Sequence, residues 1–194
     1  MNHRVKNSLA IVASMLRLQA SEVNDANLTT HLDEASHRVA AIARAHEQLY
    51  HGSDVERMDV GAYIETVCKD LDESVSQCRI HTDVQKGIDI DTDRAISSAL
   101  IVNELITNAA KYAYEGRSGG EIWVTVARAG DDRFSISVRD QGVGLPAGYD
   151  SSKAKGLGMR IVNSFVQQLQ GSVAVLRHGP GTEVVVTIPR PPPR

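Results

Sequence analysis

The sequence of 194 residues predicts an α+β fold in which an N-terminal helical hairpin precedes an α/β sandwich domain. Two observations support this fold class. Apolar residues recur at spacings of three and four near the N-terminus, which is the period of an amphipathic helix. From about residue 58, helical segments alternate with stretches such as EIWVTVAR, whose alternating apolar and polar residues are typical of strands. We therefore expect a hairpin domain over residues 1–52, a second domain over 58–189 and a Pro-rich tail over 190–194.

The composition excludes several classes of function. A formal net charge of −3 gives no basic patch that would attract nucleic acid, and no apolar run approaches the roughly 20 residues of a membrane span. Cys68 and Cys78 are ten residues apart and lack the CxxC spacing of a zinc site or the number of cysteines of a disulfide framework. These features favour a cytoplasmic protein without a membrane segment and without a nucleic-acid partner.

The first predicted helix runs from residue 2 to about residue 20. Its apolar stripe is formed by Val5, Leu9, Val12 and Leu16, and Ile11, Met15 and Leu18 should widen this core-facing stripe. At 100° per residue, His3 falls on the opposite side and should face solvent. A second helix is expected over 28–50, with its apolar seam at Leu28, Leu32, Ala35, Val39, Ile42 and Leu49.

The linker between these helices holds two candidate caps for the second helix, Asn27 and Asp25. Each helix carries more apolar surface than one neighbour can cover, and a two-helix hairpin alone is marginally stable. A homodimer with a four-helix bundle would solve this problem. A monomer in which the hairpin packs on the rest of the chain is the alternative.

In the second domain, helical and strand patterns alternate along the chain. After a hinge at HGSDVERMD, we expect a helix at 60–76, strands at 79–84 and 88–90, a helix at 92–114 opened by the Asp91–Asp93 cluster, a hairpin of EIWVTVAR with DRFSISVRD, a helix closed by Gly171, and a last hairpin of SVAVLRH with TEVVVTIP.

The stretch ELITNAAKYAY places three polar groups on the long helix. Glu104, Asn108 and Lys111 occur at i, i+4 and i+7, so a carboxylate, an amide and an ammonium should line one edge. Oxygen ligands suit Mg²⁺ and an ammonium counters phosphate charge, so this edge fits a metal-bound polyphosphate. An ordinary exposed Glu/Lys helix face is the equally simple alternative.

Two further stretches combine glycines with a possible ligand contact. In RDQGVGLP, Asp140 ends a strand, and Gly142 and Gly144 allow the backbone to bend and approach a ligand. In AKGLGMRIV, Gly156 and Gly158 precede a helix whose free N–H groups favour an anion. Each stretch alone could also be a turn or a flexible loop.

The order of these motifs, followed by GTEVVVTIP, resembles the ATP-binding domain of the GHKL superfamily, which includes the gyrase and Hsp90 ATPases and the sensor histidine kinases. The opening HRVKNSLAIVASMLRLQA resembles the phosphoacceptor helix of the histidine kinases, in the subgroup related to the HWE kinases whose acceptor box reads HRxKN. The resemblance extends from His3 to Pro189. The HWE signatures themselves are missing, because Asn103 precedes Glu104 and Trp123 is followed by Val124, which indicates a sister group.

This resemblance implies a protein histidine kinase that uses ATP and Mg²⁺, autophosphorylates His3 and passes the phosphoryl group to an aspartate of a response regulator receiver domain. By the same resemblance, Asn108 would hold the metal with Glu104 and Lys111 serving the metal and phosphates around it, and Asp140 would accept from the adenine amino group. Gly142 and Gly144 would shape the adenine pocket, Gly156 and Gly158 would allow a lid to cover the phosphates, and Thr182 would support the adenine side.

Two alternatives remain open at this stage. One is a GHKL ATPase or serine kinase whose first helix serves only for dimerisation, and the other is a histidine phosphotransfer or docking module with a vestigial nucleotide site. The general base for His3 is not assigned, because Arg4 stands where the commonest histidine kinases have an acidic residue, and a distant side chain such as Glu47 is a candidate. Asn7 is the one hint of a phosphatase activity toward the regulator.

Overall fold

The computed structural model describes residues 2–22, 25, 28–30, 32, 35–36, 39–40, 43, 57–75, 78–116, 119–145 and 157–190, without the side chains of 2–8, 10, 17, 22, 73–74 and 157. The chain divides into two compact units, residues 1–55 and 56–194, which are described one at a time. Within the described residues, no helix is both long and apolar enough to cross a membrane.

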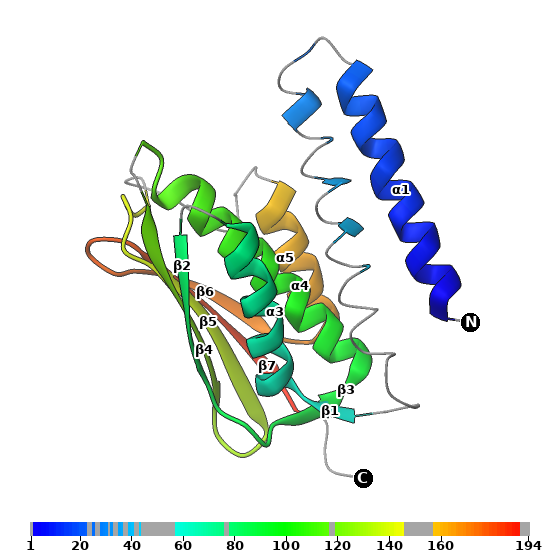
Figure 1. The fold of residues 1–194 in the computed structure, drawn as a ribbon. Helices are drawn as coiled ribbons and strands as arrows, with labels where there is room; N and C mark the ends of the chain where they lie inside the picture. The colour runs from blue at the N-terminus through cyan, green and yellow to red at the C-terminus, as the bar shows by residue number, and fades with distance from the viewer. Residues whose placement is uncertain are drawn as a thin grey trace. The chain divides into compact units, whose positions relative to one another are not determined.

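The first unit contains helix α1 (Asn2–Glu22), drawn in blue in Figure 1, which confirms the first predicted helix. The Leu28 N–H donates to the Asp25 carboxylate at 3.1 Å, so Asp25 is a cap of the segment that follows. Residues 28–30, 32, 35–36, 39–40 and 43 are helical, and the other positions of the predicted 28–50 helix lie outside the described residues, as does the alternative cap Asn27.

Small side chains form the buried seam of this unit. Ala13 and Ala20 of α1 are almost fully buried, and so are Ser36 and Ala43, in each case at a spacing of seven. The Ser36 hydroxyl donates to the Ala13 carbonyl at 3.0 Å, which joins the two segments directly. Small residues allow two helix backbones to approach closely, and the approach decides which apolar residues are covered.

The assignment of Val12 to the buried stripe was wrong, because 44% of Val12 is exposed. The seam passes instead through Ala13, one residue further along the helix. Ile11, Met15 and Leu18 are also exposed, and they lie at spacings of four and three. A second apolar stripe therefore runs along α1, on a side that the described residues of the first unit leave exposed.

The second unit is an α+β domain, as expected. Its elements are β1 (Arg57–Asp59), α3 (Val60–Ser74), β2 (Cys78–Val84), β3 (Asp89–Asp91), α4 (Thr92–Asn108), the π-helix η1 (Ala109–Ala113), β4 (Gly120–Arg128), β5 (Arg133–Asp140), α5 (Leu157–Gln168), β6 (Ser172–Arg177) and β7 (Thr182–Pro189). Both predicted hairpins are confirmed, since β4 pairs antiparallel with β5 and β6 with β7.

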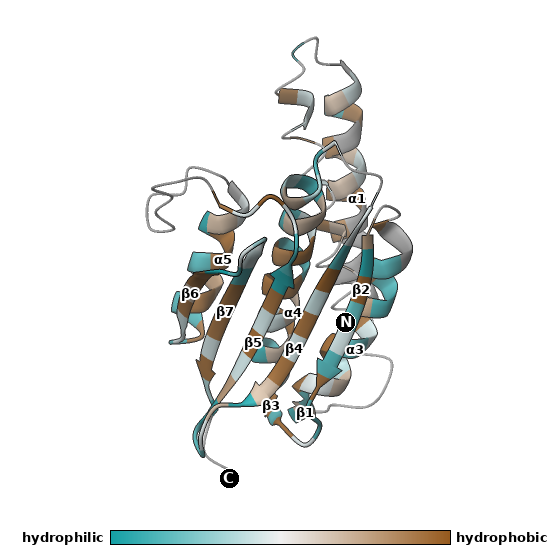
Figure 2. Ribbon diagram, turned by 90° about the vertical axis from the view of Figure 1, so that its left-hand side faces the viewer, coloured by the Kyte–Doolittle hydropathy of each residue, from teal (hydrophilic) through white to brown (hydrophobic). Residues whose placement is uncertain are grey.

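The main sheet has the strand order β2-β4-β5-β7-β6. Only β2 with β4 is a parallel pair among the described strands, and β1 pairs with β3 in a separate two-stranded sheet. Helices α3, α4 and α5 cover one face of the main sheet (Figure 1), and Figure 2 shows the matching alternation of brown and pale residues along β4, β5 and β7. The core between sheet and helices includes Ile64, Ile101, Val124, Phe134, Ile136, Val162 and Val186.

The predicted helix over 92–114 is two elements. The α-helix ends at Asn108, and residues 109–113 form the π-helix η1. A π-turn widens the backbone by one residue and is common near functional sites, but no residue preference announces it in a sequence. Asp91 occupies the N-cap position of α4, yet its side chain makes no capping hydrogen bond, contrary to the expected Asp91–Asp93 cap.

The end of α5 also differs from the expectation. Gln170 takes the left-handed conformation with φ 55°, and Gly171 follows it with its N–H donating to the Val166 carbonyl at 2.8 Å. The Gln170 N–H also donates to the Gln167 carbonyl at 2.9 Å. The two hydrogen bonds are those of a Schellman motif in which the left-handed residue is Gln170. Gly171 is required for another reason, because a Cβ there would stand 2.6 Å from the Thr187 carbonyl oxygen of β7.

One strand was missed in the sequence. Residues 57–59 were assigned to a hinge, whereas they form β1 and end at Asp59, the N-cap of α3. The Asp59 carboxylate accepts from Ala62 N–H at 3.1 Å and, through its other oxygen, from Gly87 N–H at 2.6 Å. This side chain therefore fastens the start of α3 to the loop between β2 and β3.

Candidate active site

Asp140, the last residue of β5, is a buried carboxylate with 7% of its surface exposed. Its Oδ1 accepts hydrogen bonds from Gly142 N–H at 2.8 Å and from Thr182 N–H at 3.3 Å. Burying an unpaired carboxylate costs on the order of several kcal/mol, and hydrogen bonds from these two backbone donors offset that cost. Both described bonds use Oδ1, so Oδ2 is the atom available to a hydrogen-bond donor from outside the protein.

Glycines bring three backbone segments together around Asp140. A Cβ on Gly142 would overlap the Ala113 carbonyl, and a Cβ on Gly181 would overlap the carbonyl of Asp140 itself. Gly181 also has a φ of 120°, which side-chain-bearing residues rarely adopt. Gly144, the second predicted glycine of this loop, lies against the Gly181 backbone, with 3.4 Å between its ideal Cβ position and the Gly181 oxygen.

Glu104 and Asn108 share one edge of α4, as their spacing predicts. Glu104 is 4% exposed, and the first turn of α5 lies beside it. A Cβ built on Gly158 would stand 2.9 Å from Glu104 Oε2 and 3.2 Å from Asn108 Oδ1. The carboxylate of Glu104 and the side-chain amide of Asn108 therefore meet beside Gly158, in the first turn of α5.

These oxygens fit a magnesium ion by donor chemistry. Mg²⁺ prefers oxygen ligands and is usually held by one or two protein groups together with substrate phosphates and water. Within the described residues, no group of three or more His, Cys, Asp or Glu side chains could hold a metal alone. A metal at Glu104 and Asn108 would therefore need further ligands, such as water or substrate phosphates.

Lys111 does not continue the α4 edge in the predicted way. It lies in η1, is exposed, and places its ammonium 5.4 Å from the centre of the Tyr112 ring. The spacing of seven from Glu104 assumed an unbroken α-helix, and the π-turn changes the direction of every side chain beyond Asn108. Glu104 and Asn108 are brought together by the fold, and Lys111 lies one turn further along.

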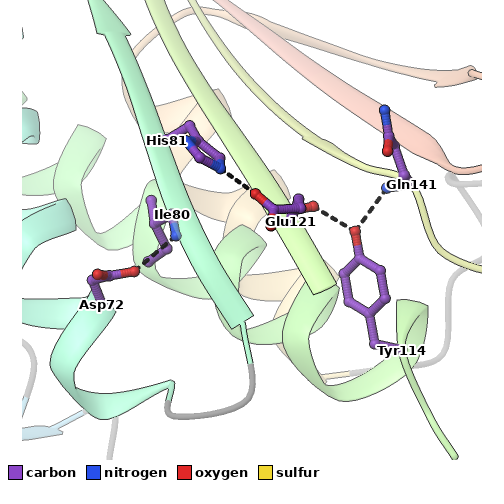
Figure 3. Close-up of polar contacts among 6 residues, drawn as sticks. All are labelled: Asp72, Ile80, His81, Tyr114, Glu121 and Gln141. Carbon is purple, nitrogen blue, oxygen red and sulfur yellow. Dashed lines mark hydrogen bonds and ion pairs between the residues drawn. The ribbon is translucent and has the colours of Figure 1, made fainter. Parts of the chain in front are cut away.

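The element η1 is bonded to the loop that follows Asp140. Val143 N–H donates to the Ala113 carbonyl at 3.0 Å. The Tyr114 hydroxyl accepts from Gln141 N–H at 2.9 Å and donates to the Glu121 carbonyl, as Figure 3 shows. The sequence interpretation missed Tyr114, because its partner Gln141 is 27 residues away and no local spacing connects them.

The remaining predicted residues lie elsewhere or outside the description. His3 is in the first turn of α1, in the unit of residues 1–55, and its side chain is outside the described part of the chain. Gly156 also lies outside the described residues. Thr182 begins β7 and contacts Asp140 through its backbone N–H.

Comparison with known families identifies both halves of the chain. Residues 1–75 match the family described as histidine kinase. Residues 94–192 match the family described as histidine kinase-, DNA gyrase B-, and HSP90-like ATPase. The second match contains every predicted site residue except His3, and the first contains His3.

Individual proteins give the same picture. The chain is 30% identical over 192 residues to blue-light-activated histidine kinase 2 of Erythrobacter litoralis, covering 96% of this chain and 55% of that protein. It is 32% identical over 194 residues to the sensor histidine kinase PdtaS of Mycobacterium tuberculosis, covering 97% of this chain and 38% of that protein.

Among solved structures, the Erythrobacter litoralis EL346 blue-light activated histidine kinase is similar with a TM-score of 0.70 and 25% identity, covering 97% of this chain and 57% of that one. The chain thus spans between about two fifths and three fifths of the length of these relatives. Its ATPase half carries the strand order, buried carboxylates and glycine contacts described above. The chain belongs to the family of histidine kinase-, DNA gyrase B- and HSP90-like ATPases, with a histidine kinase domain ahead of its ATPase domain.

Proposed function

We propose that this chain is the catalytic core of a two-component histidine kinase, which autophosphorylates His3 with ATP and transfers the phosphoryl group to a response-regulator aspartate. The observation that carries the proposal is the buried Asp140, whose Oδ1 is occupied by two backbone donors while Oδ2 remains for a ligand. The amino group of adenine is a donor of the required kind. The matches to histidine kinase families and relatives support the same reading.

The nucleotide would lie between two groups of residues. Asp140 accepts from the adenine amino group, Gly142 and Gly144 shape the pocket around the ring, and Thr182 supports it. Asn108 would hold Mg²⁺ with Glu104 serving it, and the ion would supply positive charge that counters the phosphate charge in the transition state. Lys111 counters the charge of the phosphates. Gly156 and Gly158 would allow a lid to cover the phosphates.

His3 is the nucleophile in this proposal. An imidazole ordinarily has a pKa of about 6.5, so at neutral pH one ring nitrogen carries a free lone pair. That nitrogen attacks the γ-phosphorus, the N–P bond forms as the bridging P–O bond breaks, and ADP leaves. The ring proton passes to a base, for which Glu47 is a candidate. In the second step the N–P bond breaks as a carboxylate oxygen of the receiver domain takes the phosphoryl group.

The chain would act as a homodimer through its first unit. Ile11, Met15 and Leu18 of α1 are 56%, 59% and 65% exposed, and they recur with the spacing of a coiled-coil seam. A stripe of this kind on an amphipathic helix is stabilised when a second copy covers it, which gives a four-helix bundle. The monomer is the outcome that would argue against this part of the proposal.

The test uses the full chain with γ-labelled ATP and Mg²⁺. The wild-type chain should become labelled, with a label that is lost in acid and stable in base, as expected of phosphohistidine. The variants His3→Gln and Asn108→Ala should remain unlabelled for different reasons, since the first should still bind ATP and the second should bind Mg-ATP weakly. Label that persists in His3→Gln would contradict the proposal, and phosphate release that is unaffected by His3→Gln would favour a simple ATPase.

A further inference from the structure

Tyr114, the first residue after η1, joins three parts of the candidate site. It is 7% exposed, its hydroxyl donates to the Glu121 carbonyl at the start of β4, and it accepts from the Gln141 N–H at 2.9 Å. Figure 3 shows the hydroxyl between these two backbone groups. Gln141 directly follows Asp140, so this contact lies one residue from the carboxylate that would bind adenine.

The position of the hydroxyl in the sheet gives it a specific effect. The last paired residues of β4 and β5 are Ile122 and Asp140, and the next pair in this antiparallel register would be Glu121 with Gln141. The Tyr114 hydroxyl occupies that place, because it bonds the Glu121 carbonyl on one side and the Gln141 N–H on the other. It therefore continues the ladder through a side chain while separating the two strands.

The ring and the hydroxyl of Tyr114 have separable roles. A Cβ on Gly120 would collide with the Tyr114 ring, so the ring packs on the backbone at the start of β4 independently of the hydroxyl. A phenylalanine can occupy the same place. It would lose only the two hydrogen bonds, which leaves the Gln141 N–H without its described partner.

The neighbouring residue completes the connection. The Ala113 carbonyl accepts from Val143 N–H at 3.0 Å, and Gly142 packs against the same carbonyl. Residues 113 and 114 thus hold residues 141–143, and Gly142 N–H in turn holds Asp140 Oδ1. At its other end η1 begins directly after Asn108. The five-residue π-helix therefore separates Asn108, the proposed metal ligand, from Tyr114, which holds the loop after Asp140.

We propose that the Tyr114 hydroxyl is a positioning residue for nucleotide binding, which fixes the Asp140–Gly144 loop to the end of η1 before the ligand arrives. The inference rests on the proposed function, since it assigns Asp140 to adenine. Tyr114 does not touch the nucleotide in this proposal. It acts by preorganisation, because a loop that is already ordered loses less entropy on binding.

The experiment compares Tyr114→Phe with the wild-type chain in the binding of ADP with Mg²⁺, measured by calorimetry, and in thermal unfolding. The dissociation constant should rise about fivefold to tenfold, because without the two hydrogen bonds of the hydroxyl the loop must be ordered when the ligand binds. Amide exchange followed by NMR should show faster exchange at Gln141. With ATP, the KM should rise more than kcat falls, because the loop holds adenine and not the reacting phosphate.

The matched control is Tyr63→Phe, which removes a hydroxyl from another buried tyrosine, 5% exposed, in α3 of the same unit. It should lower the melting temperature, as Tyr114→Phe should, but it should leave the affinity for ADP unchanged. Equal affinities of Tyr114→Phe and wild type, or an unchanged exchange rate of the Gln141 amide, would overturn the positioning role. The proposed function fails separately, if the wild-type chain and Asp140→Asn bind ADP with the same affinity.

Discussion

Asp140 and Glu104 show how single buried carboxylates can be placed for a ligand. One oxygen of Asp140 accepts hydrogen bonds from two backbone N–H groups, and Glu104 lies beside Asn108 and the first turn of α5. Charged groups at such depth are costly unless they are paired, so their environment must supply partners. In both cases a glycine allows the close approach, since a Cβ on Gly142 or on Gly158 would collide with the neighbouring atoms.

Gly158→Ala tests the polar space at Glu104. The added Cβ would stand 2.9 Å from Glu104 Oε2 and 3.2 Å from Asn108 Oδ1, where phosphate and metal are proposed to bind. Alanine stabilises a helix by about 1 kcal/mol over glycine, and this gain offsets the cost of the close contacts, so the free energy of unfolding should change little. The affinity for Mg-ADP should fall about tenfold. Calorimetric binding and thermal unfolding measure the two effects. Ser164→Ala, an exposed position of the same helix, is the control and should bind as wild type does.

Cys68 gives a prediction of pH dependence. Burial, followed by the nearby charges of Asp72 and Glu65, raises the pKa of the Cys68 thiol from 9.0 to about 12. The folded state disfavours the thiolate, so ionisation of Cys68 favours the unfolded chain. The contribution of the protonated thiol to the free energy of unfolding is therefore fully present below pH 9 and is lost as the pH rises from 9 toward 12. Between pH 8 and pH 10 the wild-type chain should lose about 1.4 kcal/mol more than Cys68→Ala.

Urea unfolding at the two pH values measures this difference. Equal losses in the two proteins would show that Cys68 is not the group responsible. The same raised pKa keeps the thiol protonated and unreactive, so alkylation of Cys68 by iodoacetamide at pH 8 should require unfolding.

At the scale of elements, the first helix and the π-helix deviate most from what their sequences suggest. In α1 the buried seam follows Ala13 and Ala20 and leaves larger apolar residues exposed. In the second unit, η1 interrupts a helix whose sequence reads as continuous. Both deviations lie at places where we propose a partner, a second helix pair for α1 and a nucleotide for the domain that contains η1.

The double variant Met15→Glu with Leu18→Glu tests the exposed stripe of α1. Two carboxylates buried between helices are strongly unfavourable, so the proposed dimer should dissociate into monomers at micromolar concentration. Sedimentation equilibrium measures the mass directly. Gln19→Glu adds charge at an exposed position of the same helix and should leave the dimer intact. A wild-type chain that is monomeric at these concentrations would refute the four-helix bundle.

At the scale of the whole molecule, the residues proposed to bind the nucleotide belong to one unit. The described contacts of Asp140, Glu104, Asn108 and Tyr114 all come from residues 56–194. The sheet and its three covering helices give that unit its own core. His3 lies in the other unit, so the phosphorylation that we propose would require both units, whereas the proposed nucleotide binding would require one.

A fragment of residues 56–194 should therefore fold and bind ADP with Mg²⁺ as the full chain does, within about twofold, because it keeps every described contact of the site. It should not become labelled from ATP, since it lacks His3. Calorimetry and the labelling assay measure both properties. A fragment that unfolds cooperatively but fails to bind ADP would show that the first unit contributes to the nucleotide site.

Local spacing was sufficient for part of the site. Glu104 and Asn108 are four residues apart on one helix, so their shared edge follows from helix geometry. The two hairpins followed from alternation and turn residues. The contact of Tyr114 with Gln141 could not be found this way, because it depends on how a π-helix and a strand end meet across 27 residues.

The sequence by itself determined the two-part organisation that we propose, the α+β fold class and the identity of the polar groups, because these depend on local periodicity and on residue chemistry. The tertiary structure decided which groups work together. It placed Thr182 N–H on Asp140, Gly158 against Glu104 and the Tyr114 hydroxyl between two strands. These contacts join residues distant in the chain, and only the packing of helices on a sheet fixes the distances between them.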